Sequence, residues 1–281
     1  MNRLRYLNKT IKAVTFDVTG TLLHHPRPIA QSYLESAQWA RLKDCPTEAE
    51  FKVAFKSAYK ATLLEYPFFR HPRNQWWKRM LELALQHTGR NYSQEDFERF
   101  YLRTYQYYGS HEAYAVYDEV VPLLQFLRCA NCVLGVVSNT PVRTIESTLP
   151  MLGLHKHFDF FVSAQGFGGF KPDQPIFYDA LRQSEFWHAE MTGDVAGIAP
   201  HCEILPEEVL HIGDSLEADF RGARACGFQA ALLARSRSVQ FNDWLVAPEA
   251  GSTSQQELQR HTYHSLADLR RDLHVEEVAW M

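Results

Sequence analysis

Short apolar stretches recur along the second half of the chain and are separated by segments with helical spacing. Four of these stretches predict buried strands: 132–137, 158–163, 209–212 and 229–233. The segments between them predict helices: 141–152, 174–183 and 216–226. An earlier stretch, 11–16, predicts a further buried strand that stops at Asp17. Strands that alternate with helices indicate right-handed βαβ units and a parallel sheet covered on both faces.

A long region from about 24 to 117 looks helical throughout. Helical spacing recurs in four of its segments: 29–42, 48–64, 75–87 and 94–107. We therefore expect an α/β protein, with a Rossmann-like parallel-sheet core of residues 1–23 and 118–281 and an inserted helical bundle of residues 24–117. The insertion leaves just after the first strand, so it should lie over the C-terminal end of that strand, where active sites of open α/β sheets are found.

Three segments are harder to place. The first twelve residues carry four basic side chains and no acidic one, and we favour a solvated arm over a cleaved transit peptide. Segment 187–206 is longer than a usual helix-to-strand link and is expected to be a surface excursion. Segment 235–263 is polar and mixed, and 265–273 predicts a last helix.

Composition narrows the class of protein. Of 281 residues, 46% are hydrophobic and 22% are charged, as in ordinary globular proteins. The net charge of −4 provides no basic field for nucleic acid or an anionic membrane surface. No apolar run reaches the roughly 18 residues that a membrane span needs. Five cysteines, an odd number, favour reduced thiols over a disulfide framework. We expect a cytoplasmic protein, a monomer or weak homodimer, with no nucleic-acid or membrane partner.

Polar residues follow the first two predicted strands at the points where they end. Asp17 precedes Gly20, which permits a tight turn that presents the carboxylate as a nucleophile or a metal ligand. The alternative is a turn Asp that bonds its own backbone. Ser138 and Asn139 stand at the mouth of a helix, where a hydroxyl and backbone N–H groups bind an anion. They also fit a simple helix N-cap.

The later strand ends carry further charged groups. Lys171 lies in a turn before a helix and can offer its ammonium group to a phosphate or carboxylate, unless solvent surrounds it. Asp214 and Asp219 stand at the top of a strand and the start of a helix, where two acids suit Mg²⁺ and its preference for oxygen ligands. Helix capping is the alternative for Asp214. The combination is more specific than any single residue.

In the order of its motifs and the place of its helical insertion, the chain resembles the haloacid dehalogenase superfamily over nearly its whole length. The matching segments are Asp17-Val18-Thr19-Gly20-Thr21, Val137-Ser138-Asn139, Gly169-Phe170-Lys171-Pro172-Asp173 and Gly213-Asp214-Ser215-Leu216-Glu217-Ala218-Asp219. The insertion looks like the helical cap that this family carries in its first insertion site. Within it, Gln75-Trp76-Trp77 is similar to a eukaryotic subgroup typified by the rhythmically expressed gene 2 protein.

The resemblance implies a phosphatase-type hydrolase that acts on a small phosphorylated metabolite. By the family's motifs, Asp17 attacks phosphorus and becomes an aspartyl phosphate. Ser138, Asn139 and Lys171 would hold the phosphate, with Lys171 offsetting the charge of the clustered carboxylates. This is physically coherent, because a phosphate dianion approaches several carboxylates only where a divalent ion and a lysine neutralise them.

The same motifs imply a site for Mg²⁺, with ligands from Asp17, the Thr19 backbone carbonyl and Asp214, while Asp219 supports the metal and orients Lys171. Family phosphatases usually carry a second Asp where this chain has Thr19. That Asp protonates the leaving oxygen and later activates water, and a threonine hydroxyl does not titrate near neutral pH. We expect limited turnover, because losing acid–base help typically costs about 10²–10⁴ in rate.

Thr19 at this position is also consistent with two other functions. The chain would then be a phosphotransferase, or a catalytically weak phosphate-binding or regulatory protein. A 2-haloacid dehalogenase ranks last, because the resemblance implies that such enzymes need neither magnesium nor an acid like Asp214. His24 and His25 follow the nucleophile turn and titrate in the range that a replacement acid would need. The favoured alternative is that the segment His24-His25-Pro26-Arg27-Pro28 is a rigid, solvated linker.

Overall fold

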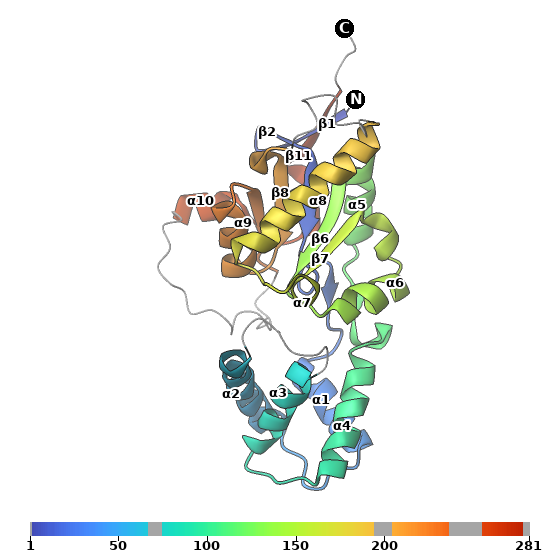
Figure 1. The fold of residues 1–281 in the computed structure, drawn as a ribbon, viewed down its shortest axis with the longest axis vertical. Helices are drawn as coiled ribbons and strands as arrows, with labels where there is room; N and C mark the ends of the chain where they lie inside the picture. Colours follow the sequence, from blue (N-terminus) through green and yellow to red (C-terminus); the bar gives the residue numbers. More distant parts are fainter. Residues whose placement is uncertain (1, 67–74, 194–203, 236–254, 278–281) are drawn as a thin grey trace.

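The computed structural model describes residues 2–66, 75–193, 204–235 and 255–277. At its centre lies a sheet of six parallel strands in the order β10-β9-β8-β3-β6-β7 (Figure 1). The strands are β3 (Ala13–Phe16), β6 (Val133–Ser138), β7 (Phe160–Ser163), β8 (Val209–Gly213), β9 (Gln229–Leu233) and β10 (Thr262–Tyr263). The predicted α/β class is confirmed, and the first five of these strands match the five predicted from apolar stretches.

Helices cover both faces of this sheet, which explains why its strands are apolar at successive positions. Alternate residues of β3 face opposite ways. Val14 and Phe16 pack with residues of α5 (Val120–Cys129) and α11 (Leu266–Arg271). Ala13, on the other face, belongs to a cluster with residues of α8 (Gln174–Thr192) and α9 (Gly222–Ala225).

The order of the strands brings the predicted site together. From β3 the chain continues to β6 and β7 on one side, and later to β8, β9 and β10 on the other. Phe16, the last residue of β3, therefore pairs with Val136 of β6 and Ile212 of β8. The C-terminal ends of these three strands meet at a topological switch point, where ligands of open α/β sheets bind.

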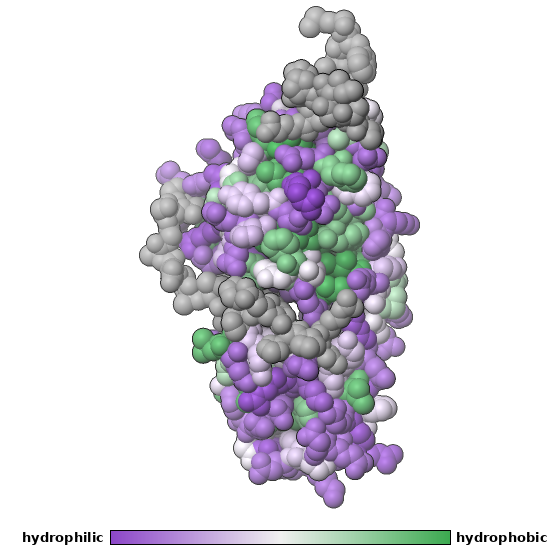
Figure 2. Space-filling model, in the orientation of Figure 1, coloured by the Kyte–Doolittle hydropathy of each residue, from purple (hydrophilic) through white to green (hydrophobic). Residues whose placement is uncertain are grey.

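Four helices form a separate group beyond the sheet (Figure 1). They are α1 (Ile29–Trp39), α2 (Glu48–Glu65), α3 (Gln75–Gln86) and α4 (Gln94–Tyr107), and each confirms a predicted helix, although α1 ends earlier than expected. Thr47 and Glu50 form a capping box that begins α2, and Ser93 caps α4. The helices bury apolar side chains in a cluster of their own, and the face seen in Figure 2 is mainly hydrophilic over this part.

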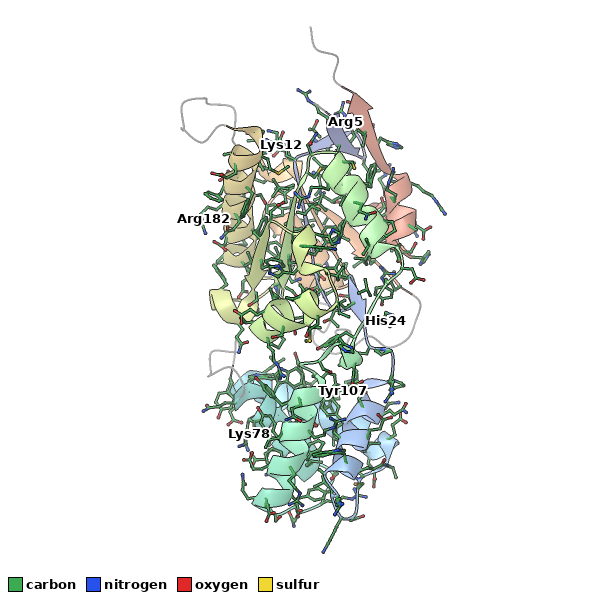
Figure 3. All side chains as sticks on the ribbon, turned by 90° about the vertical axis from the view of Figure 1, so that its right-hand side faces the viewer. Arg5, Lys12, His24, Lys78, Tyr107 and Arg182 are labelled. Carbon is green, nitrogen blue, oxygen red and sulfur yellow. The ribbon has the colours of Figure 1, made fainter. Side chains whose placement is uncertain are left out.

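The chain passes to and from these helices at one place. Strands β4 (Leu23–His24) and β5 (Ala115–Val116) pair antiparallel there, and Figure 3 shows His24 at this crossing. Arg235, two residues after β9, lies 3.6 Å from the ring centroid of Tyr117 and donates a hydrogen bond to the Thr21 carbonyl. The domain boundaries at 23/24 and 117/118 stay a prediction.

The expectation of a solvated N-terminal arm is wrong. Residues Asn2–Tyr6 form β1, which pairs antiparallel with β2 (Lys9–Ile11) and with β11 (Leu273–Glu277) from the far end of the chain. Leu4 and Tyr6 are fully buried, while Arg3 and Arg5 alternate with them on the outer side. The alternation of apolar and basic residues is typical of a half-buried strand.

The other two segments that were harder to place, 187–206 and the C-terminal part from 235, also differ from expectation where they are described. Helix α8 continues to Thr192, well past the predicted 174–183, because nothing in Trp187–Thr192 breaks a helix. The rest of 187–206 lies largely outside the described residues, as does most of 235–263, whose described end forms α10 (Gln255–Arg260) and β10. The helix predicted at 265–273 is α11, which is shorter and is followed by β11.

Short elements complete the described chain. The helices predicted at 141–152 and 216–226 each contain a π-helical turn, η3 (Thr144–Thr148) and η6 (Leu216–Arg221). The remaining short helices are α6 (Leu149–Met151), α7 (Ala164–Phe167), η2 (His111–Ala113), η4 (His155–His157) and η5 (Pro206–Glu208). In the parts of the chain that are described, every cysteine is unpaired, and no helix combines the length and apolar character needed to cross a membrane.

Candidate active site

Asp17 is the first residue after β3, and its backbone is held in place by the neighbouring strand. Its N–H donates to the Ile212 carbonyl at 2.9 Å, and the residue is 6% exposed. Gly20 then turns the chain with φ +88°, a conformation that favours glycine. A Cβ at Gly20 would lie 2.1 Å from Oδ2 of Asp214, so the missing side chain also lets the two acids approach.

Lys171 is the buried centre of the site, at 2% exposure. Its Nζ donates hydrogen bonds to Oδ1 of Asp17 at 2.8 Å, to Oδ1 of Asp219 at 2.5 Å and to the Val137 carbonyl at 2.7 Å. The Ser138 hydroxyl donates to the same oxygen of Asp17 at 2.8 Å. The two loops that follow β6 and β7 thus converge on one carboxylate oxygen.

Asn139 lines the cavity, and its side-chain amide also contacts the lysine loop. Its Nδ2 donates to the Lys171 carbonyl at 3.0 Å, and its Oδ1 accepts from the Lys171 N–H at 2.8 Å. The side chain therefore holds the backbone of the lysine loop against the end of β6. Any contact of Asn139 with substrate stays a prediction.

Asp219 accepts hydrogen bonds from residues to which the sequence analysis assigned no role. Its Oδ2 accepts from the Ser215 N–H at 2.9 Å, and its Oδ1 lies 3.1 Å from Nε2 of buried His211. Because a carboxylate only accepts, Nε2 carries the hydrogen, and Nδ1 accepts from the Thr15 hydroxyl at 2.9 Å. Thr15 and His211 are cross-strand partners in β3 and β8, so two polar residues at matching positions of apolar strands were the available signal.

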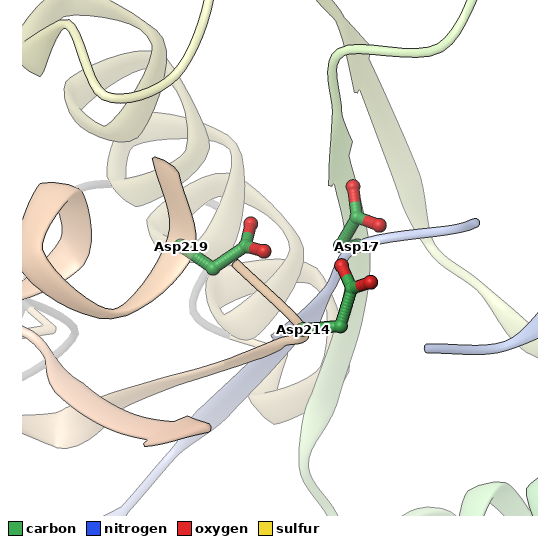
Figure 4. Close-up of side chains that lie close together, drawn as sticks. All are labelled: Asp17, Asp214 and Asp219. Carbon is green, nitrogen blue, oxygen red and sulfur yellow. The ribbon is translucent and has the colours of Figure 1, made fainter. Parts of the chain in front are cut away.

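Three carboxylates meet at this end of the sheet. Asp17, Asp214 and Asp219 each offer an oxygen, and these atoms lie within 4.8 Å of one another; Figure 4 shows the three side chains close together. Asp17 and Asp219 are buried and Asp214 is partly exposed. Three negative charges face the single positive charge of Lys171, and a donor set made only of oxygen suits a hard divalent cation. The residues present therefore fit Mg²⁺.

Burial and the ion pairs set the charge states. Burial raises the pKa of Asp17, and Lys171 offsets this only in part. Burial alone would also raise the pKa of Asp219, but Lys171 and the hydrogen bond from His211 outweigh it and hold that pKa well below its usual range. The two carboxylates raise the pKa of Lys171 despite its burial. Burial lowers the pKa of His211, so the ring is neutral and keeps the tautomer given above.

A cavity of about 570 Å³ joins this site to the helical group. Its floor includes Asp17, Thr19 and Lys171, and its opposite wall is mostly aromatic. Thr19 is partly exposed in the turn that follows Asp17, where the Thr19–Leu23 bridge fixes the backbone. The predicted solvated linker is wrong for the two histidines, because His25 lines the cavity and His24 packs 4.6 Å from the ring of Tyr117.

Comparisons with known proteins agree with the motifs. A family model described as a haloacid dehalogenase-like hydrolase matches residues 11–227. The haloacid dehalogenase-like hydrolase domain-containing protein 3 of Bos taurus is 29% identical over 229 residues, covering 80% of this chain and 82% of that protein. The rhythmically expressed gene 2 protein of Drosophila melanogaster is 25% identical over 279 residues, covering 96% and 97%. The resemblance drawn from the sequence motifs is confirmed.

Solved structures share the fold. YfnB from Bacillus subtilis, bound to magnesium, has a TM-score of 0.62 at 17% identity, covering 95% of this chain and 98% of that chain. A 2-haloacid dehalogenase from Pseudomonas syringae pv. Tomato DC3000 has a TM-score of 0.57 at 23% identity, covering 93% and 97%. At these identities, the two similarities show the fold alone. The match of the family model over most of its length nevertheless means that the chain belongs to the haloacid dehalogenase-like hydrolases.

Proposed function

We propose that this hydrolase is a magnesium-dependent phosphatase of small phosphorylated metabolites, with Asp17 as nucleophile and with limited turnover. The cluster of Asp17, Asp214 and Asp219 around a single buried lysine carries this proposal. A phosphate monoester would meet an excess of negative charge there unless a divalent cation offsets it. Such a cation would supply charge neutralisation for the phosphate and for the attacking carboxylate.

The contacts support the following parts for these residues in the proposed transfer. Ser138 and Lys171 hold Oδ1 of Asp17, which leaves Oδ2 to attack phosphorus as the bond to the leaving oxygen breaks. The leaving group departs with the electron pair and takes its proton from water, and water then hydrolyses the aspartyl phosphate. Asp17, Asp214 and the Thr19 carbonyl would hold Mg²⁺. Asp219 has a supporting role, because its oxygens already accept hydrogen bonds from Lys171, His211 and Ser215.

Asp214 favours phosphoryl transfer over dehalogenation. A carboxylate displacing halide from a haloacid needs no metal, and a third acid beside it would only repel the anionic substrate. Here Asp214 is brought against the nucleophile turn by Gly20, where a side chain would collide with it. YfnB, which shares the fold, holds magnesium. A metal-dependent reaction is the use of Asp214 that this arrangement supports best.

The limit on turnover rests on Thr19 and on the state of His25. Nδ1 of His25 lies 2.8 Å from the Ala113 carbonyl, so it carries the hydrogen and points it away from any substrate. Burial lowers the pKa of His25, which keeps the ring neutral near pH 7. A neutral ring with that tautomer has no proton to give at Nε2. Neither Thr19 nor His25 therefore replaces the missing acid, and substrates with good leaving groups should react best.

The nucleophile is tested by Asp17→Asn. With Mg²⁺, we expect the wild-type chain to hydrolyse acetyl phosphate and 4-nitrophenyl phosphate, and the variant to be reduced to background. Asp179→Asn, which changes a surface acid paired with Arg182, is the matched control and should keep full activity. Activity that survives Asp17→Asn, or that ignores removal of Mg²⁺ by a chelator, would contradict the proposal.

Thr19→Asp separates the phosphatase from its alternatives. If the missing acid limits turnover, the variant should hydrolyse alkyl phosphates faster than the wild type. The increase in rate should approach the roughly 10²–10⁴-fold that is typical of acid–base catalysis. A labelled acyl phosphate adds a second readout. A long-lived aspartyl phosphate in the wild type with no gain in Thr19→Asp would favour a phosphotransferase or a regulatory protein. The absence of any aspartyl phosphate would favour a binding protein.

A further inference from the structure

The wall of the cavity opposite Asp17 is built from aromatic side chains. Six tyrosines and Trp77 contribute to it, the tyrosines being Tyr33, Tyr59, Tyr101, Tyr105, Tyr108 and Tyr114. Ile29, Leu63 and Leu81 fill the space between them. Flat rings prefer to pack against other rings, with centroids about 4.5–7 Å apart. A leaving group that enters this wall is therefore selected first by its apolar surface.

The same wall carries no net charge. Among the described residues between 24 and 117, no Asp, Glu, Lys or Arg lines the cavity. Burial raises the pKa of Tyr114 to about 12 and that of Tyr33 well above its usual value, so these phenols stay neutral. Arg143 lines the opposite side, but it lies 4.0 Å from the ring centroid of Tyr105 and donates to the Tyr105 carbonyl. These contacts hold its guanidinium against α4.

Two polar atoms in the wall have no hydrogen-bond partner among the described residues, the Tyr108 hydroxyl and Oγ1 of Thr104. Thr104 of α4 lines the cavity at 3% exposure, and its Oγ1 makes no hydrogen bond to any described residue. Buried threonines in helices normally bond the carbonyl four residues earlier, as Thr62 does with Ala58 at 2.8 Å. A buried hydroxyl without a partner costs free energy, and a bound ligand that supplies the partner removes that cost.

We propose that the leaving group of the substrate is an uncharged aromatic alcohol or phenol, whose ring packs against Trp77 and the tyrosines and whose own polar substituent bonds Thr104. This rests on the proposed function, since it places the phosphate at Asp17. The cavity of about 570 Å³ holds a ring of this size with its phosphate. Phosphates that carry a second anionic group should bind more weakly, because the wall between residues 24 and 117 supplies no positive charge and the floor carries carboxylates.

Non-hydrolysable phosphonates test the substrate class without the influence of leaving-group reactivity. Dissociation constants measured by calorimetry with Mg²⁺ should be at least roughly tenfold lower for 2-phenylethylphosphonate than for propylphosphonate, because ring burial adds apolar area and ring contacts. The 2-carboxyethylphosphonate should bind more weakly than propylphosphonate. Equal affinity of the aromatic and propyl probes in the wild-type chain would overturn the inference.

Variants then locate the preference. Trp77→Leu keeps an apolar side chain and should reduce the aromatic-to-propyl ratio to roughly threefold or less. Trp39→Leu is the control, because Trp39 is 61% exposed and lies outside this cavity. Thr104→Val should lower the ratio of affinities for ring-hydroxylated over unsubstituted aromatic probes by roughly 2- to 10-fold. Thr62→Val is its control. An unchanged ratio in both Trp77→Leu and Thr104→Val would overturn the assignment.

Acetyl phosphate separates this inference from the function on which it rests. Its leaving group is too small to reach the aromatic wall, so its hydrolysis depends on Asp17 and not on Trp77 or Thr104. Hydrolysis that requires Asp17, combined with no aromatic preference, would refute the substrate class and leave the phosphatase standing. Aromatic binding without hydrolysis would refute the phosphatase and leave an aromatic phosphate-binding site.

Discussion

Replacing Lys171 with methionine removes the positive charge of two ion pairs that are among the most buried in the described part of the chain, and it keeps the length of the side chain. In the wild type, its Nζ contacts two carboxylates and a backbone carbonyl, and the residue is 2% exposed. The variant would leave Asp17 and Asp219 buried side by side without the cation. Removing one partner of a buried pair typically costs about 3–5 kcal/mol in the free energy of unfolding.

The cost should depend on pH, and its sign follows from the pKa directions. In the wild type, the lowered pKa of Asp219 means that its ionisation stabilises the fold above the unfolded value near 4, and this is lost in stronger acid. Without Lys171, burial raises both carboxyl pKa values above the unfolded value. The variant is then stabilised below about pH 4 and loses stability as pH rises through those raised values. Its deficit should be larger at pH 8 than at pH 5.

Urea unfolding at pH 5 and pH 8 measures both effects, with a chelator present to exclude metal. Lys78→Met is the matched control, because Lys78 also pairs with a carboxylate, Glu98, but both side chains are about one third exposed. Such a surface pair contributes only about 0–1 kcal/mol, with little dependence on pH in this range. If Lys171→Met destabilises no more than Lys78→Met, or if its deficit does not grow toward pH 8, the electrostatic account of the site is wrong.

Two further substitutions test the turn and the N-terminal sheet. Gly20→Ala would place a Cβ 2.1 Å from Oδ2 of Asp214, so the Mg²⁺ affinity measured by calorimetry should fall. Gly89→Ala is the control. Gly89 also has a positive φ, but a Cβ there would have no neighbour within 4 Å, so the Mg²⁺ affinity should be unchanged. Leu4→Ala should lower the free energy of urea unfolding by about 2–5 kcal/mol, because Leu4 is fully buried in β1. Leu64→Ala, at an 85% exposed site, should change it by at most about 0.5 kcal/mol, and a Leu4→Ala effect equally small would restore the interpretation of a solvated arm.

The sequence was sufficient for the parts of the fold that repeat a simple pattern. Strands buried on both faces are apolar runs, so β3, β6, β7, β8 and β9 could be read directly. Their order along the chain then predicts which C-terminal ends carry polar groups. Asp17, Ser138, Lys171 and Asp214 were found in this way, before any contact among them was known.

Contacts between distant segments could not be read in the same way. The partner of β1 is β11, separated from it by almost the whole chain, and no local signal pairs them. The hydrogen bond between His211 and Asp219 depends on strand register, because a one-residue shift would turn His211 to the other face of the sheet. Trp76 and Trp77 are neighbours in sequence, yet Trp76 is buried among the helices while Trp77 lines the cavity. That difference depends on how α3 is rotated against its neighbours.

The pairing of β4 with β5 has a consequence for engineering. Both ends of the helical segment leave the sheet side by side, and paired strands keep their Cα atoms about 4.5–5.5 Å apart. An unrelated helical segment whose termini are equally close can therefore be grafted between His24 and Ala115 without shifting the register of β3. The groups that perform the chemistry would be retained while the recognition surface is exchanged, which makes this crossing a natural splice point for building new selectivity.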